Sequence, residues 1–318
     1  MDDNEIDLGG LAPINDNADD DVVQSFRVES SALRGRVVRL GSVVDDVLAA
    51  HDYPPAVGQL VGEVMALCAL LSSMLKYDGV FTLQAKGDGA VKLLVADMNG
   101  AGDLRGCATF DAAAVEALDD GAKLADILGQ GYVTFTVQPD DTDVGEPYQG
   151  IVALEGESLV DCALHYFAQS EQIETAVKIA VGREGALGDG KWRAGGVMLQ
   201  MMPEEGGTDG GVKVVKDGDD VREDWRRARI LMESVSDDEL LDAGLHSHIL
   251  LHRLYHDEGV RVFEPQGVHK NCRCSEDKVL RVIATLSPED LEYVTKDGKI
   301  VMKCEFCSHE YAVDPATL

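Results

Sequence analysis

The chain has 318 residues, and its 58 Asp and Glu against 28 Lys and Arg give a formal charge of −30. Because phosphate groups are bound mainly by Lys and Arg, this balance argues against a nucleic-acid partner. Hydrophobic residues make up 45% of the chain, which is enough for a buried core. The longest apolar stretch, 64–75, is too short to span a bilayer, and the acidic N-terminus is unlike a secretory leader. We therefore expect a cytoplasmic protein with no membrane partner.

The first segment, 1–22, carries eight acidic residues and no basic one. Such a composition cannot bury enough apolar surface to offset the entropy of ordering. We therefore expect an acidic disordered tail.

Residues 23–215 have the mixed pattern of an α+β core domain. β-branched, aromatic and alternating residues predict strands at 36–40, 79–85, 91–96, 132–137, 150–154, 175–181 and 194–201. The turn Gly87-Asp88-Gly89 joins two of these strands into a hairpin, and a second hairpin is expected over 132–154. Strands joined by short turns favour a mostly antiparallel sheet with packed helices.

Two helices are expected within this core. The run from Pro54 to Leu75 is apolar on nearly every face, which is typical of a buried helix. The second helix is expected over 158–170, where Ser158 and Asp161 resemble a capping box.

Residues 216–262 indicate a helical linker. A stretch rich in Gly and acidic residues, 204–220, marks the boundary before it. Apolar residues at helical spacing and a capping box at 236–239 indicate two helices, and a third is expected at 249–254. Polar helices of this length are marginal alone, so they need a packing partner. Four histidines nearby are interpreted as part of a solvated helix face: His246, His248, His252 and His256.

Residues 263–318 form a small C-terminal module with helices expected after Ser275 and Ser287 and a strand at 299–303. It contains two cysteine pairs separated by 29 residues: Cys272, Cys274, Cys304 and Cys307. Four thiolates in a tetrahedron are a common structural zinc site, so these residues are the predicted zinc ligands. We expect the nearby charges of Lys270, Arg273 and Lys303 to offset the formal charge of −2 on such a site.

The cysteine pattern alone leaves three interpretations open: a permanent structural zinc site, a redox-switching site and free buried thiols without a metal. Thiolates are the form that oxidants attack, and each pair is close enough to form a disulfide. The other cysteines, Cys68, Cys107 and Cys162, have apolar or small neighbours and are interpreted as buried. Two histidines, His269 and His309, are weaker candidate ligands.

Motifs of other sites are weak or missing. The sequence contains no nucleophile elbow, phosphate loop or His-Glu-x-x-His. The acidic run 140–143 lacks calcium-loop spacing and is interpreted as a solvated turn. We therefore do not expect an enzyme.

The residues resemble those of the 33-kDa redox-regulated heat-shock chaperonin family. The resemblance combines both cysteine pairs, Ser275 and Tyr311 with motifs of the core: Leu33-Arg34-Gly35, Tyr53-Pro54, Gly62-Glu63, Thr82-Leu83-Gln84, Leu104-Arg105-Gly106, the 166–172 segment and the 194–200 segment. It extends from about residue 26 to the end of the chain.

The resemblance implies an ATP-independent holdase, a chaperone of the stress response that binds unfolding client proteins. It implies that zinc is bound by the four cysteines of the reduced, inactive form. Oxidation would then form the disulfides Cys272–Cys274 and Cys304–Cys307, release zinc, unfold the linker and expose the client-binding surface. A homodimer of the oxidised form and transfer of clients to ATP-dependent foldase chaperones are implied as well.

Two features depart from the family pattern. The acidic tail is longer than expected, and Glu276 and Asp277 stand where a basic run often follows the first pair. The second departure concerns the reactivity of the thiols and leaves the ligands intact. A static zinc-ribbon adaptor and a thiol–disulfide oxidoreductase remain the alternatives.

Overall fold

The computed structural model describes residues 20–31, 33–75, 78–119, 121–140, 146–184, 190–202, 218–296 and 298–315. Most of the expected acidic tail, most of the Gly-rich stretch 204–220 and residues 141–143 of the acidic turn lie outside these ranges. The end of the expected tail is in ordered contacts, because Asp20 pairs with Arg193 and Asp21 Oδ1 accepts a hydrogen bond from Gly41 N at 2.8 Å.

The first sheet, sheet A, has the strand order β10-β1-β2-β9-β8, and β11 also pairs with β1. Its strands are β1 (Val22–Val28), β2 (Leu33–Leu40), β8 (Thr175–Arg183), β9 (Trp192–Met201), β10 (Val260–Val262) and β11 (Gln266–Gly267). Every pairing in it is antiparallel. The strands expected at 36–40, 175–181 and 194–201 are confirmed. Strand β1 is not among the predicted strands, because it follows directly on the acidic segment that is expected to be disordered.

The second sheet, sheet B, has the order β12-β5-β4-β3-β6-β7. Its strands are β3 (Gly79–Gly87), β4 (Val91–Asn99), β5 (Asp103–Phe110), β6 (Gly131–Pro139), β7 (Tyr148–Ala153) and β12 (His269–Lys270). Both expected hairpins are confirmed, since β3 pairs with β4 and β6 with β7 in antiparallel register. Only β12, from the far end of the chain, joins this sheet in parallel.

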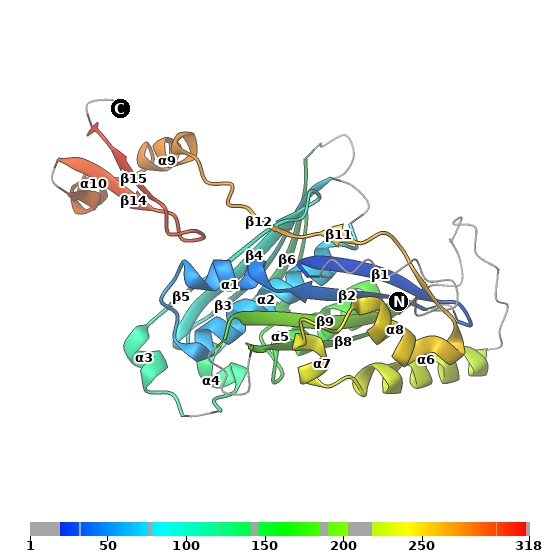
Figure 1. The fold of residues 1–318 in the computed structure, drawn as a ribbon. Helices are drawn as coiled ribbons and strands as arrows, with labels where there is room; N and C mark the ends of the chain where they lie inside the picture. The colour runs from blue at the N-terminus through cyan, green and yellow to red at the C-terminus, as the bar shows by residue number, and fades with distance from the viewer. Residues whose placement is uncertain are drawn as a thin grey trace.

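The buried helix α2 (Pro55–Ser72) packs against strands of both sheets (Figure 1). Proline has no backbone N–H to donate within a helix and is tolerated at the helix start, and Pro54 accordingly stands at the N-cap of α2. The helix is long and apolar enough to cross a membrane, but 78% of it is buried inside the protein. The expectation of a core helix is confirmed.

Shorter helices complete the core: α1 (Ser42–Ala49), α3 (Ala112–Glu116), α4 (Leu124–Leu128) and α5 (Leu159–Tyr166). The expected capping box of α5 is present, because Ser158 Oγ accepts from Asp161 N and the Asp161 carboxylate accepts from Ser158 N. The helix expected over 158–170 is α-helical only to Tyr166 and continues as a short π-helix over Phe167–Glu171. The antiparallel α+β class is confirmed.

The linker helices α6 (Gly218–Glu233), α7 (Asp237–Leu241) and α8 (Ser247–Tyr255) lie along the outer face of sheet A (Figure 1). A second apolar cluster joins them to the sheet, with Phe26, Val197 and Leu199 on the strands and Met232 and Leu251 on the helices. The packing partner that the polar helices require is therefore the core domain itself.

One prediction for this segment is wrong. His248 is not on a solvated face: it is 8% exposed, and its Nε2 lies 3.1 Å from Gln24 Oε1 in β1. The helix turns this position toward the sheet, together with Leu251 and Tyr255.

A bridging segment, 260–270, leads from the linker to the C-terminal module. It contributes β10 and β11 to the edge of β1 and then β12 to the edge of β5, so it crosses from one sheet to the other (Figure 1).

The module itself has helices α9 (Glu276–Ile283) and α10 (Pro288–Val294) and strands β13 (Thr295–Lys296), β14 (Lys299–Lys303) and β15 (Glu310–Val313). Its apolar centre is small, formed by Ile283, Ile300 and Val313 with partly buried neighbours. Ser275 and Ser287 cap the two helices as the sequence predicts.

Candidate metal centre

Four thiols meet in the module. The Sγ atoms of Cys272, Cys274, Cys304 and Cys307 all lie within 4.8 Å of one another, and no other such group of metal-binding side chains is found among the residues that the structure describes. Cys272 Sγ is 3.7 Å from Cys304 Sγ, and Cys274 Sγ is 3.6 Å from Cys307 Sγ. The structure therefore brings the two predicted pairs together.

Each pair is fixed by a local turn. The first pair stands immediately before α9, whose N-cap Ser275 accepts from Lys278 N. The second pair lies between β14 and β15, where Ser308 N donates to Cys304 O at 2.8 Å and Cys304 N to His309 O at 2.9 Å. Ser308 has φ 59°, a left-handed conformation that closes this tight turn.

The donor set fits zinc. Four sulfurs at the usual zinc–thiolate distance of about 2.3 Å would be about 3.8 Å apart in a tetrahedron, close to the two contacts above. All four cysteines are partly buried. The weaker candidates His269 and His309 are not in the cluster.

The protein environment acts unequally on three of the thiols, Cys274, Cys304 and Cys307. Burial raises the pKa of Cys274, but hydrogen bonds from Tyr311 Oη, at 3.1 Å, and from the other thiols outweigh it and lower this pKa to about 7. Burial raises the pKa of Cys307 to about 12, and it also raises the pKa of Cys304. Of these three thiols, Cys274 is the one whose anion the surrounding chain favours most.

Charged side chains of the module and of the core lie near the site. Lys270 Nζ donates to Asp46 O at 2.8 Å, and Arg273 forms an ion pair with Asp97 of β4. A further cation comes from the core, because Arg105 Nη1 is 4.0 Å from Cys272 Sγ. Arg105 and Tyr311 belong to the motifs of the family resemblance, whereas no sequence motif indicates Asp97.

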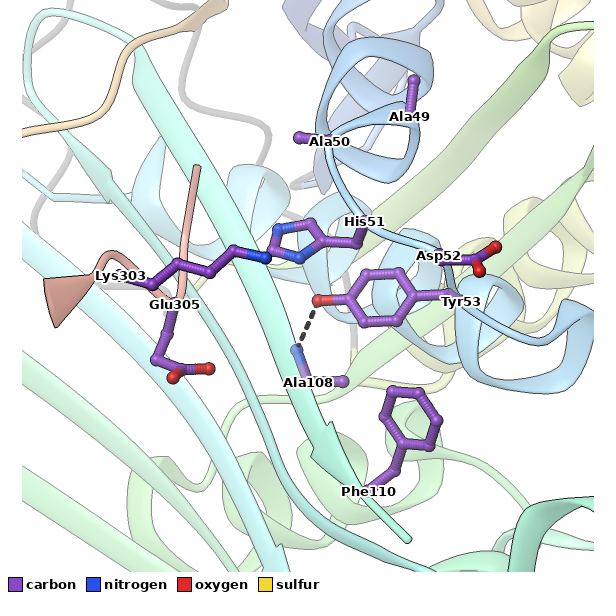
Figure 2. A pocket seen from close by; sticks show the side chains of 9 residues that line it. All are labelled: Ala49, Ala50, His51, Asp52, Tyr53, Ala108, Phe110, Lys303 and Glu305. Atoms are coloured by element: carbon purple, nitrogen blue, oxygen red, sulfur yellow. Dashed lines mark hydrogen bonds between the residues drawn. The ribbon is translucent and has the colours of Figure 1, made fainter. Parts of the chain in front are cut away.

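A cavity of about 630 Å³ marks where the module meets the core (Figure 2). His51 and Tyr53 enter it from the segment after α1, and Lys303 and Glu305 enter it from the module. The Tyr53 hydroxyl accepts a hydrogen bond from Ala108 N at 3.0 Å, and His51 stacks on Tyr53 with ring centroids 4.7 Å apart. The lining is polar on the module side and aromatic on the core side.

The three remaining cysteines are buried, as predicted. Cys68 lies in α2, Cys162 in α5 and Cys107 in β5. Burial raises the pKa of each thiol, and that of Cys107 reaches about 12. None of them joins the metal cluster.

Comparison with known proteins covers both the core and the module. The model of the family described as "Hsp33 protein" matches residues 21–314. The chain belongs to the Hsp33 family. A 33 kDa chaperonin of Caulobacter vibrioides is 41% identical over 307 residues, covering 93% of this chain and 95% of that protein. A 33 kDa chaperonin of Pseudomonas fluorescens is 36% identical over 305 residues, covering 95% and 94%.

The family also accounts for the fold. A crystal structure of the 33 kDa chaperonin of Thermotoga maritima has a TM-score of 0.71 at 20% identity and covers 93% of this chain and 96% of that one. Membership of the Hsp33 family identifies the chain as a chaperone, and the expected resemblance is confirmed.

Proposed function

We propose that this chaperone is an ATP-independent holdase that oxidation activates. The observation that carries the proposal is the meeting of four thiols in a small module that contacts the core and follows a polar helical linker in the chain. In the reduced form Cys272, Cys274, Cys304 and Cys307 would hold one zinc ion. Bound zinc would supply a charge centre that keeps the thiolates together and stabilises the folded module.

The proposed switch is a two-electron oxidation of each cysteine pair. Two thiolates, one molecule of hydrogen peroxide and two protons give one disulfide and two molecules of water. The pairing Cys272–Cys274 and Cys304–Cys307 rests on the family resemblance alone. The short sulfur contacts of the reduced form run between the two turns instead, from Cys272 to Cys304 and from Cys274 to Cys307. Two peroxide molecules therefore convert all four thiolates into groups that bind metal poorly.

Loss of the ligand set removes the main stabilisation of the module, because its apolar centre is small. The linker helices would then lose order and uncover the apolar outer face of sheet A, including Phe26 and Val197, for unfolding client proteins. We propose the boundaries 23–215 for the core, 216–262 for the linker and 263–318 for the module. An oxidised homodimer, delivery of clients to ATP-dependent foldases and a cytoplasmic location complete the proposal.

Light scattering of a chemically unfolded client diluted into buffer tests the proposal. The protein is added either reduced and zinc-loaded or after peroxide treatment at raised temperature, and released zinc is measured with a coloured chelator. Suppression of aggregation together with zinc release, only after oxidation, is the expected result. Equal suppression in both states would remove the redox control, and retained zinc without suppression would indicate a static zinc adaptor.

Two cysteine variants make the test specific. Cys304→Ser removes a proposed ligand and is expected to weaken zinc binding and deregulate the chaperone. Cys162→Ala, at a buried cysteine of α5, is the matched control and should switch normally. Normal zinc affinity and normal switching in Cys304→Ser would refute the ligand assignment.

A further inference from the structure

A buried carboxylate of the core reaches the first cysteine turn. Asp97 in β4 is 4% exposed, and it accepts hydrogen bonds from its cross-strand neighbour Arg105 at 3.0 Å from Nε and 2.9 Å from Nη2. The same carboxylate pairs with Arg273, the residue between Cys272 and Cys274. Arg273 Nη1 also donates to Asp103 O at 3.2 Å. The turn of the first pair is therefore tied to β4 and β5.

Arg105 reaches the second turn as well. Its guanidinium lies over the ring of Phe306, 3.9 Å from the centroid, and Phe306 stands between Cys304 and Cys307. On the other side of this turn, His51 Nε2 is 3.2 Å from Phe306 O and His51 Nδ1 is 3.3 Å from Ser308 Oγ. Both cysteine turns are thus held against the core.

These contacts need both partners in place. A buried carboxylate that loses one of its cationic partners is left with an uncompensated charge, which is strongly unfavourable. The flat fork of Arg105 can bind the carboxylate along its edge and stack on a ring with its face, which a lysine cannot do. Arg273 can meet Asp97 only while the turn that carries it keeps its shape. The geometry of the cysteine turns and the docking of the module are therefore linked.

We infer that Asp97 and Arg105 are positioning residues that couple retention of zinc by the four cysteines to docking of the module on sheet B. Because such coupling is reciprocal, docking strengthens zinc binding, and zinc loss favours undocking by the same factor. The effect of this coupling on activation by oxidation rests on the proposed function. The coupling itself does not rest on it, because it also applies when a chelator alone removes the zinc.

Competition for zinc between the full-length reduced protein and a coloured chelator, measured at equilibrium, tests the coupling. Asp97→Asn is compared with Asp88→Asn, which removes the same charge from the turn between β3 and β4, where the Asp88 side chain accepts a hydrogen bond from Gln130 N. We expect Asp97→Asn to bind zinc about 5- to 150-fold more weakly than the unchanged protein, the usual range for coupled sites. Asp88→Asn should bind zinc as tightly as the unchanged protein.

A second measurement reports undocking directly. Cys107 is 3% exposed and lies on the same face of β5 as Arg105, where Glu305 and Cys304 of the module act on it electrostatically. Alkylation of Cys107, followed by mass spectrometry, should be faster in zinc-loaded Asp97→Asn than in zinc-loaded Asp88→Asn. If Asp97→Asn does not fold, Arg105→Lys replaces it, because this variant keeps the charge and loses the fork.

The outcomes separate the inference from the proposed function. Equal zinc affinities and equal rates of Cys107 alkylation in Asp97→Asn, Arg105→Lys and the control would overturn the coupling, whatever peroxide does. Weaker zinc binding in the variants, with no release of zinc by peroxide in any protein, would support the coupling and refute the redox switch.

Discussion

Replacing Tyr255 by alanine should detach the linker while the metal centre stays intact. Tyr255 ends α8, is 0% exposed, stacks on Phe26 at 5.8 Å and donates its hydroxyl proton to Ala228 O of α6 at 3.2 Å. It therefore joins two linker helices to β1. Truncating a buried aromatic side chain to alanine costs about 3–5 kcal/mol. Because α8 has only 9 residues and cannot persist alone, this cost falls on linker docking.

A change of this size raises the ratio of detached to docked linker by about two to four orders of magnitude. Reduced, zinc-loaded Tyr255→Ala should therefore suppress client aggregation without peroxide, and a protease should cleave its linker sooner. Tyr255→Phe loses only the hydrogen bond, which is worth about 0.5–1.5 kcal/mol. Its chaperone activity without peroxide and its rate of linker cleavage should therefore lie between those of Tyr255→Ala and those of the unchanged protein.

Ile230→Ala is the matched control, because Ile230 lies on α6 and is 49% exposed. It should behave like the unchanged protein. If zinc-loaded Tyr255→Ala is as inactive and as resistant to protease as this control, linker docking does not hold the chaperone in its resting form.

Three further predictions concern the core and the module. Burial raises the pKa of Glu63 from 4.5 to about 7, so the folded chain binds the proton more tightly than the unfolded chain. This contribution to stability is complete below pH 4.5 and is lost as the pH rises to about 7, and thermal melts across this range should show a step that Glu63→Gln removes. Ser275→Ala removes the cap of α9 at a cost of about 0.5–2 kcal/mol, and should speed zinc loss while leaving the melting of the core unchanged. Cys68 and Cys162 should react with a thiol reagent only after denaturant is added, whereas a zinc chelator alone should make the four module cysteines reactive. Reaction of Cys68 or Cys162 before denaturant is added would contradict their burial in the core.

The metal centre was predictable because its information is local. Cys272 and Cys274 are adjacent to the cap Ser275, and the second pair occupies one tight turn, so spacing alone indicates a shared site. The core hairpins and α2 were predictable for the same reason, since alternation, a Gly-rich turn and an all-apolar helical run each act over short distances.

The contacts that hold the module to the core could not be read from the sequence. Asp97 and Arg273 are 176 residues apart, and neither belongs to a periodic pattern that indicates the other. The burial of His248 depends in the same way on Gln24, 224 residues away. Strands of two or three residues, such as β10 and β12, are too short for an alternating pattern to be recognised in the sequence, and their pairing is decided by the sheets they join.

The bridging segment 260–270 shields two open rows of backbone hydrogen-bonding groups at once. Without β10 and β11 the outer edge of β1 has no partner, and without β12 the outer edge of β5 has none. Unpaired edges are templates on which another extended chain can add a strand. A chain that protects both edges with one segment of its own keeps these edges from pairing with another copy, and peeling that segment away would offer an unfolding polypeptide backbone pairing as well as apolar surface.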